Sequence, residues 1–393
     1  MRYHSEMSSL RPWSEVESLL ASGDVRGKLA KDDLPTPALC VDLDGLTANI
    51  NKMAAFAKSK GRALRPHGKS HKCGEIARRC IAAGAVGACA AKISEAEIFA
   101  AQGIQSILVT TAMVGRYRIE RAVKLAALIP DLILVVEDAQ NANDLNDAAQ
   151  AAKITLSVAL DLHVSYRTGV ATGAPAIALA EHVAKLPHLS LKGLQAYAGH
   201  ASHVVGFDAR IAANREAMLP AVATRQALEA KGIPCPWLSG CSTGTYNIDS
   251  DIDGITELQP GSYLFMDVDY NRIGGTSGPV YDDFANSLTV LSTVNSKPNA
   301  HSAILDAGIK ASASDRPFPP TVKGISGTAY SFSGDEHGSL ALEGDGRAIQ
   351  LGDRLELVIA HCDPTVNLYD RIFVTRGEQV EAVWTIDARG KIE

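Results

Sequence analysis

The 393-residue sequence predicts an α/β fold, a (β/α)8 TIM-type barrel followed by a C-terminal all-β domain. From about Pro35, short β-branched segments alternate with longer segments of helical periodicity, which is typical of βα units around a parallel sheet. After about Asn271, strand-like segments follow one another and are separated by Gly, Pro and Asp turns. Because roughly 240 residues hold about nine strands, a closed barrel accounts for the first region more economically than an open doubly wound sheet.

The predicted barrel strands are short and mostly apolar. The first covers residues 38–42, and the helix expected after it covers residues 46–59, where apolar residues recur near helical spacing. The other strands are expected at residues 63–66, 86–89, 106–110, 132–136, 155–160, 191–197, 236–239 and 256–258. We therefore assign residues 34–272 to the barrel.

The C-terminal region is predicted to be a separate β-domain. Its strands are expected at residues 287–294, 303–306, 340–342, 354–358 and 382–386, with no helical segments between them. The domain then comprises residues 273–393, and we expect residues 1–33 to join it.

The composition excludes several classes of protein. Hydrophobic residues make up 46% and charged residues 21% of the chain, which excludes disordered, collagen-like and coiled-coil classes. A net charge of −6 gives no basic surface for nucleic acid, and no apolar segment reaches the roughly 20 residues of a membrane span. Seven cysteines without a CxxC pair, and an N-terminus unlike a signal peptide, indicate a reducing, cytoplasmic setting.

The densest polar cluster is the segment RPHGKSHK, residues 65–72, directly after a predicted strand. Barrel enzymes place catalytic loops at this end of their strands. An amine that is desolvated among other cations becomes nucleophilic enough to form a Schiff base with an aldehyde. Lys69 is therefore the candidate nucleophile, although an arbitrary lysine is more often solvated in a basic turn.

A second cluster, SGCSTGT at residues 239–245, follows a later barrel strand. Small residues let backbone N–H groups approach a phosphate, and the hydroxyls of Ser242, Thr243 and Thr245 can donate to it. Gly261 can complete such a cradle. A Gly/Ser/Thr segment alone is more often an ordinary loop. Together with a Schiff-base lysine, it indicates a phosphorylated aldehyde, for which pyridoxal phosphate is the obvious candidate.

Three pairs of polar residues are spaced two apart near predicted strand ends, namely Asp161 with His163, Gln195 with Tyr197, and His361 with Asp363. Residues i and i+2 of a strand face the same side, so each pair projects into one space. His361 and Asp363 are the best metal candidates, because imidazole and carboxylate suit Mn²⁺, Mg²⁺ or Co²⁺. A His-x-Asp sequence also arises by chance. The same caution applies to His200 and His203, which follow Tyr197 and can be core or helix-start histidines.

These segments together resemble the D-threonine aldolase and D-serine dehydratase-like family, which are fold-type III pyridoxal phosphate enzymes related to alanine racemase. The resemblance extends from about residue 34 to the C-terminus, and it rests on residues 34–38, 65–72, 166–170, 195–203, 239–245 and 361–363. It implies a pyridoxal phosphate barrel, a β-domain that carries the metal site, and a homodimer.

The resemblance also implies a role for each candidate residue. Lys69 matches the lysine that holds the cofactor, and His361 and Asp363 match the metal pair. The other residues expected at the cofactor are His67, Arg167, Gln195, Tyr197, Ser242, Thr243, Gly244, Thr245, Gly261, Ser262 and Tyr263. In dehydratases of this family, the second metal ligand resembles a cysteine two residues after the histidine. This chain has Asp363 there, and the aldolase branch is therefore favoured.

The implied activity is the cleavage of a β-hydroxy-D-amino acid, D-threonine or 3-hydroxy-D-aspartate, to glycine and an aldehyde or glyoxylate. The metal would bind the β-hydroxyl, and His203, or alternatively His200, would remove its proton. Lys310 and Arg316 are candidate partners of a β-carboxylate. The alternatives are a dehydratase giving a 2-oxo acid and ammonia, a racemase, and a non-catalytic pyridoxal phosphate-binding protein. The β-domain of roughly 120 residues counts against the last of these.

Overall fold

The computed structural model describes residues 11–393, and the chain divides into two compact units. The barrel unit comprises residues 50–263, 273–279 and 390–393. The sheet unit comprises the chain up to Asn49 together with residues 264–272 and 280–389. Residues 1–10, which belong to the N-terminal part predicted to join the β-domain, lie outside the described residues.

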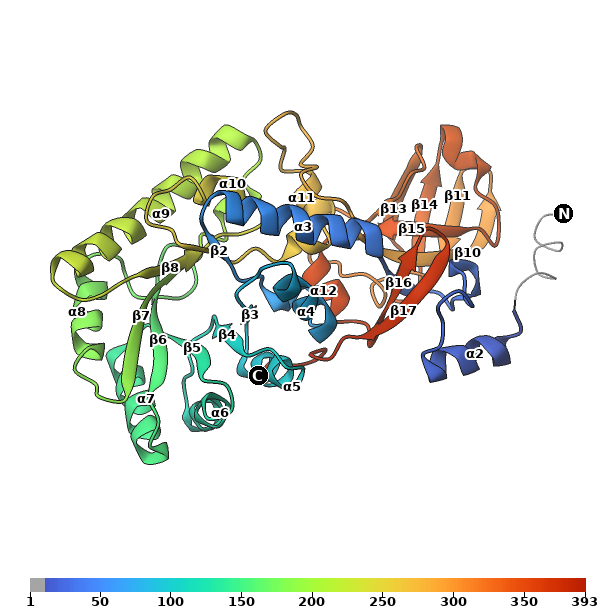
Figure 1. The fold of residues 1–393 in the computed structure, drawn as a ribbon. Coiled ribbons are helices and arrows are strands. Elements are labelled where there is room, and N and C mark those ends of the chain that lie inside the picture. The colour runs from blue at the N-terminus through green and yellow to red at the C-terminus, as the bar shows by residue number, and fades with distance from the viewer. Residues whose placement is uncertain (1–10) are drawn as a thin grey trace. The chain divides into compact units, whose positions relative to one another are not determined.

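Eight parallel strands form the sheet of the barrel unit, in the order β2-β9-β8-β7-β6-β5-β4-β3 (Figure 1). A parallel bridge between His67 and Cys89 joins the two ends of this order, so the sheet closes on itself. The predicted barrel is therefore confirmed. Its strands are β2 (Ala63–Leu64), β3 (Ala88–Ala90), β4 (Ser106–Val109), β5 (Asp131–Val136), β6 (Leu156–Leu162), β7 (Leu189–Ala196), β8 (Trp237–Gly240) and β9 (Glu257–Leu258).

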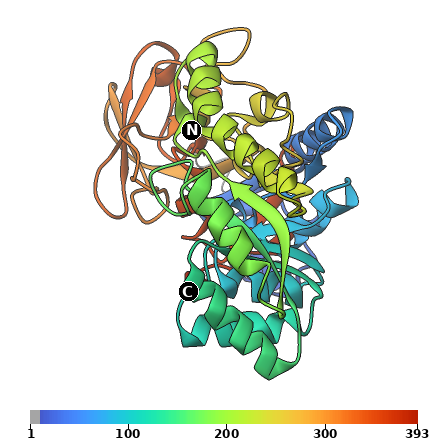
Figure 2. The same cartoon turned by 90° about the vertical axis from the view of Figure 1, so that its left-hand side faces the viewer.

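A helix follows each of the strands β2 to β8, and these helices lie along the outside of the curved sheet (Figure 2). In α7, Asp138 caps the N-terminus by accepting hydrogen bonds from two backbone N–H groups, and Ala142, Leu145 and Ala149 are buried at helical spacing. The seven helices are α4 (Gly74–Ala82), α5 (Ile93–Ala101), α6 (Arg116–Ala126), α7 (Ala139–Ala152), α8 (Ala174–Val183), α9 (Phe207–Ala230) and α10 (Tyr246–Asp249). No helix within residues 11–393 is both long enough and apolar enough to cross a membrane.

The sheet unit contains a nine-stranded mixed sheet, so the predicted C-terminal β-domain is confirmed as a fold. Its main path runs β13-β14-β11-β10-β1-β16-β17, while β15 pairs with β10 and β12. The strands are β1 (Ala38–Asp42), β10 (Leu288–Asn299), β11 (Ser302–Leu305), β12 (Thr321–Val322), β13 (Thr328–Phe332), β14 (Gly338–Leu342), β15 (Arg354–Val358), β16 (Arg371–Arg376) and β17 (Gln379–Thr385). Among the described residues of the same unit, three helices occur, namely α2 (Trp13–Ser22), α11 (Val268–Asn271) and α12 (Cys362–Val366). The prediction that no helix lies between the C-terminal strands is therefore wrong, because α12 lies between β15 and β16.

The strand at residues 38–42 is real, but its predicted place in the barrel is wrong. It is β1, which pairs antiparallel with β10 and parallel with β16. Four of its five residues are buried, and a strand that is apolar on both faces fits the centre of either kind of sheet. The helix after it, α3 (Leu43–Ser59), begins three residues earlier than expected.

The core of the sheet unit includes the segment before β1. Val16, Val25 and Leu29 pack in one buried cluster with residues of β1, β10, β16 and β17, among them Leu291 and Phe373. Ala30 also forms an isolated bridge with the first residue of β17. This part of the N-terminal segment therefore packs against the sheet.

Candidate active site

Most of the predicted cofactor-binding residues lie at the carboxyl ends of the barrel strands. Lys69 follows β2, Arg167 follows β6, and Tyr197 follows β7. The loop of residues 241–245, which we call the Ser/Thr loop, follows β8, and residues 261–263 follow β9. Parallel strands bring all of these segments to one end of the barrel, where barrel enzymes bind their substrates.

Lys69 is part of a tightly packed single turn. The turn is a 3-10 helix over Gly68–Ser70, and the backbone N–H of Lys69 donates to Nδ1 of His67 at 3.3 Å. A Cβ atom on Gly68 would lie 2.4 Å from two atoms of the Phe99 ring, so only glycine fits there. The packing fixes the backbone from which the Lys69 side chain extends.

Three of the predicted residues meet around one aromatic ring. Lys69 Nζ lies 5.7 Å from the centre of the Tyr197 ring, and Cζ of Arg167 lies 5.3 Å from the same centre. Both distances are within the range of cation–π attraction. A primary amine and a guanidinium thus lie close to a single phenol, and all three residues are among those that the family resemblance implies at the cofactor.

Gln195 belongs to a buried polar network beside this ring. Its Nε2 donates to Asp161 Oδ1 at 3.0 Å, and the hydroxyl of Thr168 donates to Asp161 Oδ2 at 2.8 Å. Burial raises the pKa of Asp161. Gln195 Oε1 is buried, and within residues 11–393 it has no hydrogen-bond partner. A donor group on a bound molecule would satisfy this oxygen.

The Ser/Thr loop is supported from behind by a buried carboxylate. The hydroxyl of Thr245 donates to Asp249 Oδ2 at 2.6 Å and accepts a hydrogen bond from the backbone N–H of Ser242 at 3.2 Å. Asn214 donates to the other carboxylate oxygen at 2.8 Å. Burial raises the pKa of Asp249 to about 6. Because a hydroxyl has one proton, Thr245 braces the loop in this arrangement instead of donating to a phosphate.

Sequence reasoning did not find Asp249. The available signal was its spacing four residues after Thr245, which places the two side chains on one face of a short helix. Asn214 comes from α9 and offered no such signal, because the contact depends on how α9 packs against the barrel.

Two glycines show how closely the loops approach one another. A Cβ atom on Gly244 would lie 2.1 Å from the carbonyl oxygen of Ser202. A Cβ atom on Gly261 would lie 3.0 Å from the carbonyl oxygen of His67 and 3.2 Å from Ser70 Oγ. The Gly261 segment therefore lies directly against the Lys69 turn. Such glycines allow the loop backbones to pack closely, and the backbone N–H of Gly244 lies 3.4 Å from Ser202 Oγ.

The neighbouring residues Thr243, Ser262 and Tyr263 are also buried. The hydroxyl of Thr243 accepts a hydrogen bond from the backbone N–H of Tyr263 at 2.9 Å, which connects the Ser/Thr loop to the segment after β9. The Tyr263 hydroxyl lies 3.9 Å from Cys80 Sγ, and burial raises its pKa. Tyr263 therefore contributes to this region through its backbone and its packing.

The two candidate bases lie in one short segment, residues 200–206, which we call the histidine segment. The His200 ring lies 5.1 Å from the exposed ring of Tyr166. Its Nδ1 is buried and has no hydrogen-bond partner in the part of the chain that the structure describes. His203 is the last residue of the 3-10 helix Ala201–His203. Both imidazoles belong to the barrel unit, as Lys69 does.

The metal candidates lie in the sheet unit, and the predicted strand geometry is wrong for them. β15 ends at Val358, His361 is the N-cap of α12, and Asp363 lies in the first turn of that helix. Pro364 favours this local structure, because proline is well tolerated in the first turn of a helix. The His361 and Asp363 side chains therefore come close together because they begin a helix, and not because they alternate along a β-strand.

The geometry of this pair is compatible with one bound cation. His361 Nε2 lies 3.9 Å from Asp363 Oδ2, and two metal–ligand bonds of about 2.1 Å span up to about 4.2 Å. Asp315 Oδ2 lies 2.7 Å from His361 Nδ1, which makes Nε2 the acceptor nitrogen of the ring. Arg316 Nη2 lies 3.4 Å from Nε2 in this structure and would have to move aside for a metal to bind there. Cys362 is fully buried, and its backbone N–H donates to Asp267 at 2.9 Å. No group of three or more His, Cys, Asp or Glu residues suited to a metal occurs within residues 11–393, so water would complete the coordination.

Lys310 and Arg316, the candidate partners of a substrate carboxylate, both form ion pairs. Lys310 is exposed and pairs with Glu336. Arg316 Nε lies 2.9 Å from Asp269 Oδ2, and its Nη2 lies 3.4 Å from His361 Nε2. Only Arg316 therefore lies beside the candidate metal pair.

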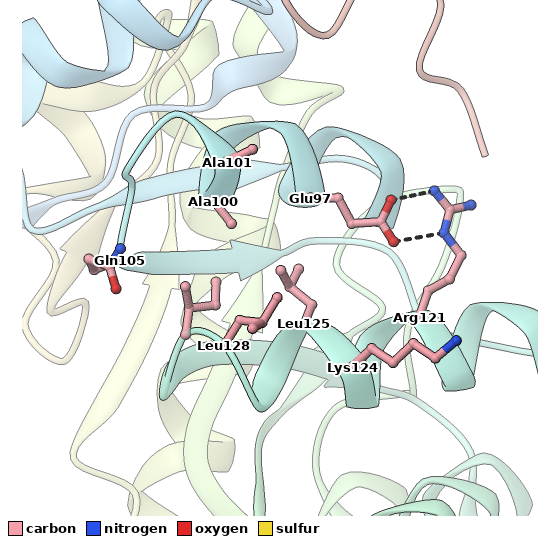
Figure 3. A pocket seen from close by; sticks show the side chains of 9 residues that line it. Glu97, Ala100, Ala101, Gln105, Arg121, Lys124, Leu125 and Leu128 are labelled. Carbon is pink, nitrogen blue, oxygen red and sulfur yellow. Dashed lines mark hydrogen bonds and ion pairs between the residues drawn. The ribbon is translucent and has the colours of Figure 1, made fainter.

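A separate surface hollow lies between α5 and α6 on the outside of the barrel (Figure 3). It measures about 290 Å³ and has apolar residues such as Leu125 and Leu128 along one side. Glu97 and Arg121 form a two-bonded ion pair at its edge, with N–O distances of 2.8 and 2.6 Å. No residue predicted to bind the cofactor lines it.

Comparisons with known proteins match both parts of the chain. Residues 41–269 match the family described as alanine racemase, N-terminal domain, and residues 287–375 match the putative serine dehydratase domain. A D-threonine aldolase from Arthrobacter sp. is 40% identical over 90% of this chain and 93% of its own length. A 3-hydroxy-D-aspartate aldolase from Paracoccus denitrificans (strain Pd 1222) is 37% identical over 92% of this chain and 94% of its own length.

The similarity extends to three-dimensional structure. The crystal structure of D-threonine aldolase from Filomicrobium marinum superposes with a TM-score of 0.90 and 37% sequence identity, over 94% of this chain and 99% of that one. The resemblance seen in the sequence is thus confirmed. This chain belongs to the alanine racemase N-terminal domain family, and it also carries a match to the putative serine dehydratase domain.

Proposed function

We propose that this protein is a pyridoxal phosphate- and divalent metal-dependent aldolase that cleaves β-hydroxy-D-amino acids to glycine and an aldehyde. The observation that carries this proposal is the similarity to proteins named D-threonine aldolase and 3-hydroxy-D-aspartate aldolase, which covers at least 90% of the chain. The substrate is D-threonine or 3-hydroxy-D-aspartate, with acetaldehyde or glyoxylate as the second product.

The residues of the barrel unit fit pyridoxal phosphate. Lys69 would hold the cofactor through its amine, and Tyr197 and Arg167 would contact the ring, because the Lys69 amine and the Arg167 guanidinium each lie within 6 Å of the centre of the Tyr197 ring. Gln195, with its buried acceptor oxygen, would receive a donor from the same molecule. The Ser/Thr loop and Gly261 would hold the phosphate. When bound, the cofactor supplies an electron sink for negative charge at the substrate α-carbon.

His361 and Asp363 would hold the metal, which we expect to be Mn²⁺, Mg²⁺ or Co²⁺. Imidazole and carboxylate ligands suit these ions, and Asp315 orients the imidazole. A bound divalent cation supplies a Lewis acid that makes a hydroxyl group more acidic. Arg316 balances Asp269 beside the pair, so that the carboxylate charge there is partly compensated before a cation binds.

Proton transfer is the task of the histidine segment. An imidazole nitrogen of His203, or alternatively of His200, would accept the proton of the β-hydroxyl group as the bond between the α- and β-carbons breaks. The tight packing of the Lys69 turn and of Gly261 keeps the backbone of the turn close to the backbone that would hold the phosphate. This packing matters, because catalysis depends on holding reacting groups in one geometry.

A dehydratase is the second candidate function, since the C-terminal match is described as a putative serine dehydratase domain. The metal pair argues against it. A dehydratase of this family is expected to have a cysteine two residues after the metal-binding histidine. This chain has Asp363 at that position. Cys362 is at the neighbouring position, where its side chain is fully buried and its thiol donates to Asp363 Oδ2 at 3.2 Å.

The experiment that tests the proposed function compares substrates and metals. The purified protein, supplied with pyridoxal phosphate, should release glycine from D-threonine and 3-hydroxy-D-aspartate and not from L-threonine. Chelation should abolish the activity and Mn²⁺ should restore it. Asp363→Ala should lose this restoration, whereas Asp370→Ala, at an exposed ion pair with Arg389, should keep it. Full activity of the chelated Asp363→Ala protein would remove the metal from the proposal.

We further propose a cytoplasmic homodimer that acts on free amino acids and binds neither membranes nor nucleic acid. The net charge of −6 supports the last point, since nucleic-acid-binding proteins are usually basic. Light scattering should give twice the chain mass of 41.5 kDa.

A further inference from the structure

Arg210 on α9 is fully buried although it is one of the largest and most polar side chains. Burial of guanidinium N–H groups costs free energy unless each finds an acceptor. Its nitrogen atoms donate to carbonyl oxygens from three separate segments at 2.7 to 2.9 Å, namely those of Gly244, Val204, Ile273 and Gly274. One side chain therefore connects three loops of the barrel unit.

Two of these loops carry the chemistry proposed above. Gly244 belongs to the Ser/Thr loop, and Arg210 Nε donates to its carbonyl oxygen at 2.8 Å. Val204 directly follows His203, and Arg210 Nη1 donates to its carbonyl oxygen at 2.9 Å. The same guanidinium thus contacts both the expected phosphate site and the segment of the candidate bases.

A second contact between the two loops is independent of Arg210. The backbone N–H of Gly244 lies 3.4 Å from Ser202 Oγ, and a Cβ atom on Gly244 would lie 2.1 Å from the carbonyl oxygen of Ser202. The loops are therefore in direct contact, and a shift of one requires a shift of the other.

We propose that Arg210 is a positioning residue that holds the histidine segment in register with the Ser/Thr loop, so that cofactor affinity and proton transfer depend on one buried side chain. The inference rests on the proposed function, because it assigns the phosphate and the base to these two loops. Arginine suits this role, since its planar guanidinium presents donors in fixed directions. Lysine keeps the charge but cannot reach the same set of carbonyl oxygens with one nitrogen.

The same helix offers a matched control. Arg225 also binds backbone carbonyl oxygens, donating to Cys235 at 2.7 Å and to Gly254 at 2.5 Å. Both acceptors precede their strands, β8 and β9, so Arg225 clamps the amino end of the barrel. It has no contact with the Ser/Thr loop or the histidine segment among the hydrogen bonds described for residues 11–393. A purely structural role for Arg210 predicts the same consequences for both substitutions.

The test compares Arg210→Lys with Arg225→Lys in the full-length chain. Three quantities are measured: the dissociation constant of pyridoxal phosphate from the protein stripped of cofactor, the midpoint of thermal unfolding, and the pH profile of kcat with D-threonine. Arg210→Lys should raise the dissociation constant at least tenfold and shift the pH of half-maximal kcat. Both substitutions should lower the midpoint of thermal unfolding to a similar extent. Arg225→Lys, however, should leave the dissociation constant of pyridoxal phosphate within twofold of the wild type.

Equal cofactor affinity and equal pH profiles for the two variants would overturn the inference. If Arg210→Lys does not fold, Gly244→Ala replaces it, because its Cβ atom forces the same two loops apart. The wild-type protein separates this inference from the proposed function. A wild type that neither binds pyridoxal phosphate nor cleaves D-threonine refutes the proposed function, whereas a competent wild type with indistinguishable variants refutes only the role of Arg210.

Discussion

Lys69 is the residue on which the cofactor assignment depends most. Its turn is held by glycine packing and by the His67 hydrogen bond, and its amine lies 5.7 Å from the Tyr197 ring. Lysines that occur in basic turns are ordinarily solvated. Here the backbone around the lysine is buried, with Gly68 and Ser70 both enclosed. The backbone that carries the amine is therefore enclosed, unlike that of a lysine in an exposed turn.

Substitution of Lys69 by alanine should remove the visible absorbance band of bound pyridoxal phosphate and lower kcat roughly a thousandfold or more. The reason is that no other amine is held at this position by the turn. Absorbance spectroscopy and a glycine assay provide the measurement. Lys60→Ala, at an exposed ion pair with Asp251, serves as the control and should retain both properties. Retention of the band by the Lys69→Ala protein would refute the assignment.

Asp249 makes the stability of the fold depend on pH. Burial raises its pKa from 3.8 to about 6, so the folded state favours the protonated form more than the unfolded chain does. The stability that this group contributes is therefore complete below about pH 4 and is lost as the pH rises to about 6. Asp249→Asn removes the titration. Relative to the wild type, its free energy of unfolding should rise by about 3 kcal/mol between pH 3.5 and pH 7.

Urea unfolding of the cofactor-free protein at several pH values measures this difference directly. The comparison uses the change with pH and not the absolute value, since Asn alters the hydrogen bonds with Thr245 and Asn214 at every pH. Parallel pH dependences for the two proteins would show that Asp249 does not titrate in this range.

At the scale of elements, the barrel strands were predictable because their β-branched segments are separated by helical segments of ordinary length. Errors arose where local sequence supports two structures. Residues 38–42 are apolar on both faces, and only pairing with β10 and β16 places them in the mixed sheet. Residues 361–363 follow a strand, but they begin a helix. β12, β13 and β16 were missed, and the pairing of β16 with β1 joins residues more than 300 positions apart.

The contact between the Lys69 turn and α5 is an element-scale constraint that can be tested by adding one methyl group. Gly68→Ala should destabilise the fold by about 1 to 3 kcal/mol, since its Cβ atom would meet the fully buried ring of Phe99 at 2.4 Å. It should also weaken cofactor binding by moving Lys69. Gly278→Ala is the matched control, because a Cβ atom there meets nothing within 4 Å. Equal unfolding free energies for the two variants would contradict the packing argument.

At the scale of the whole molecule, the sequence was sufficient to predict the order of the proposed active-site segments along the chain but not the side chains that pack behind them. Lys69, Tyr197 and Arg167 lie in different βα units, and their convergence follows from the parallel barrel itself. Asp249 and Arg210 support the site from helices, and their contacts depend on how α9 and α10 pack on the barrel. Helix packing of this kind leaves no local pattern in the sequence.

The residues of the proposed active site are distributed over both units. The barrel unit contains the amine, the Ser/Thr loop and the candidate bases, whereas the sheet unit contains His361 and Asp363. All seven cysteines are buried and free, so neither unit is held together by disulfides. Cys362 lies between the candidate metal ligands His361 and Asp363, and its thiol donates to Asp363 Oδ2. The aspartate at position 363 is the feature that favours the aldolase over the dehydratase interpretation.

The most direct test of the aldolase assignment is the stoichiometry of the products. The protein is incubated with D-threonine, pyridoxal phosphate and Mn²⁺, and glycine, acetaldehyde, 2-oxobutanoate and ammonia are quantified together. We predict one glycine and one acetaldehyde for each D-threonine consumed. Formation of 2-oxobutanoate and ammonia in equal amounts, without glycine, would contradict the account and identify a dehydratase.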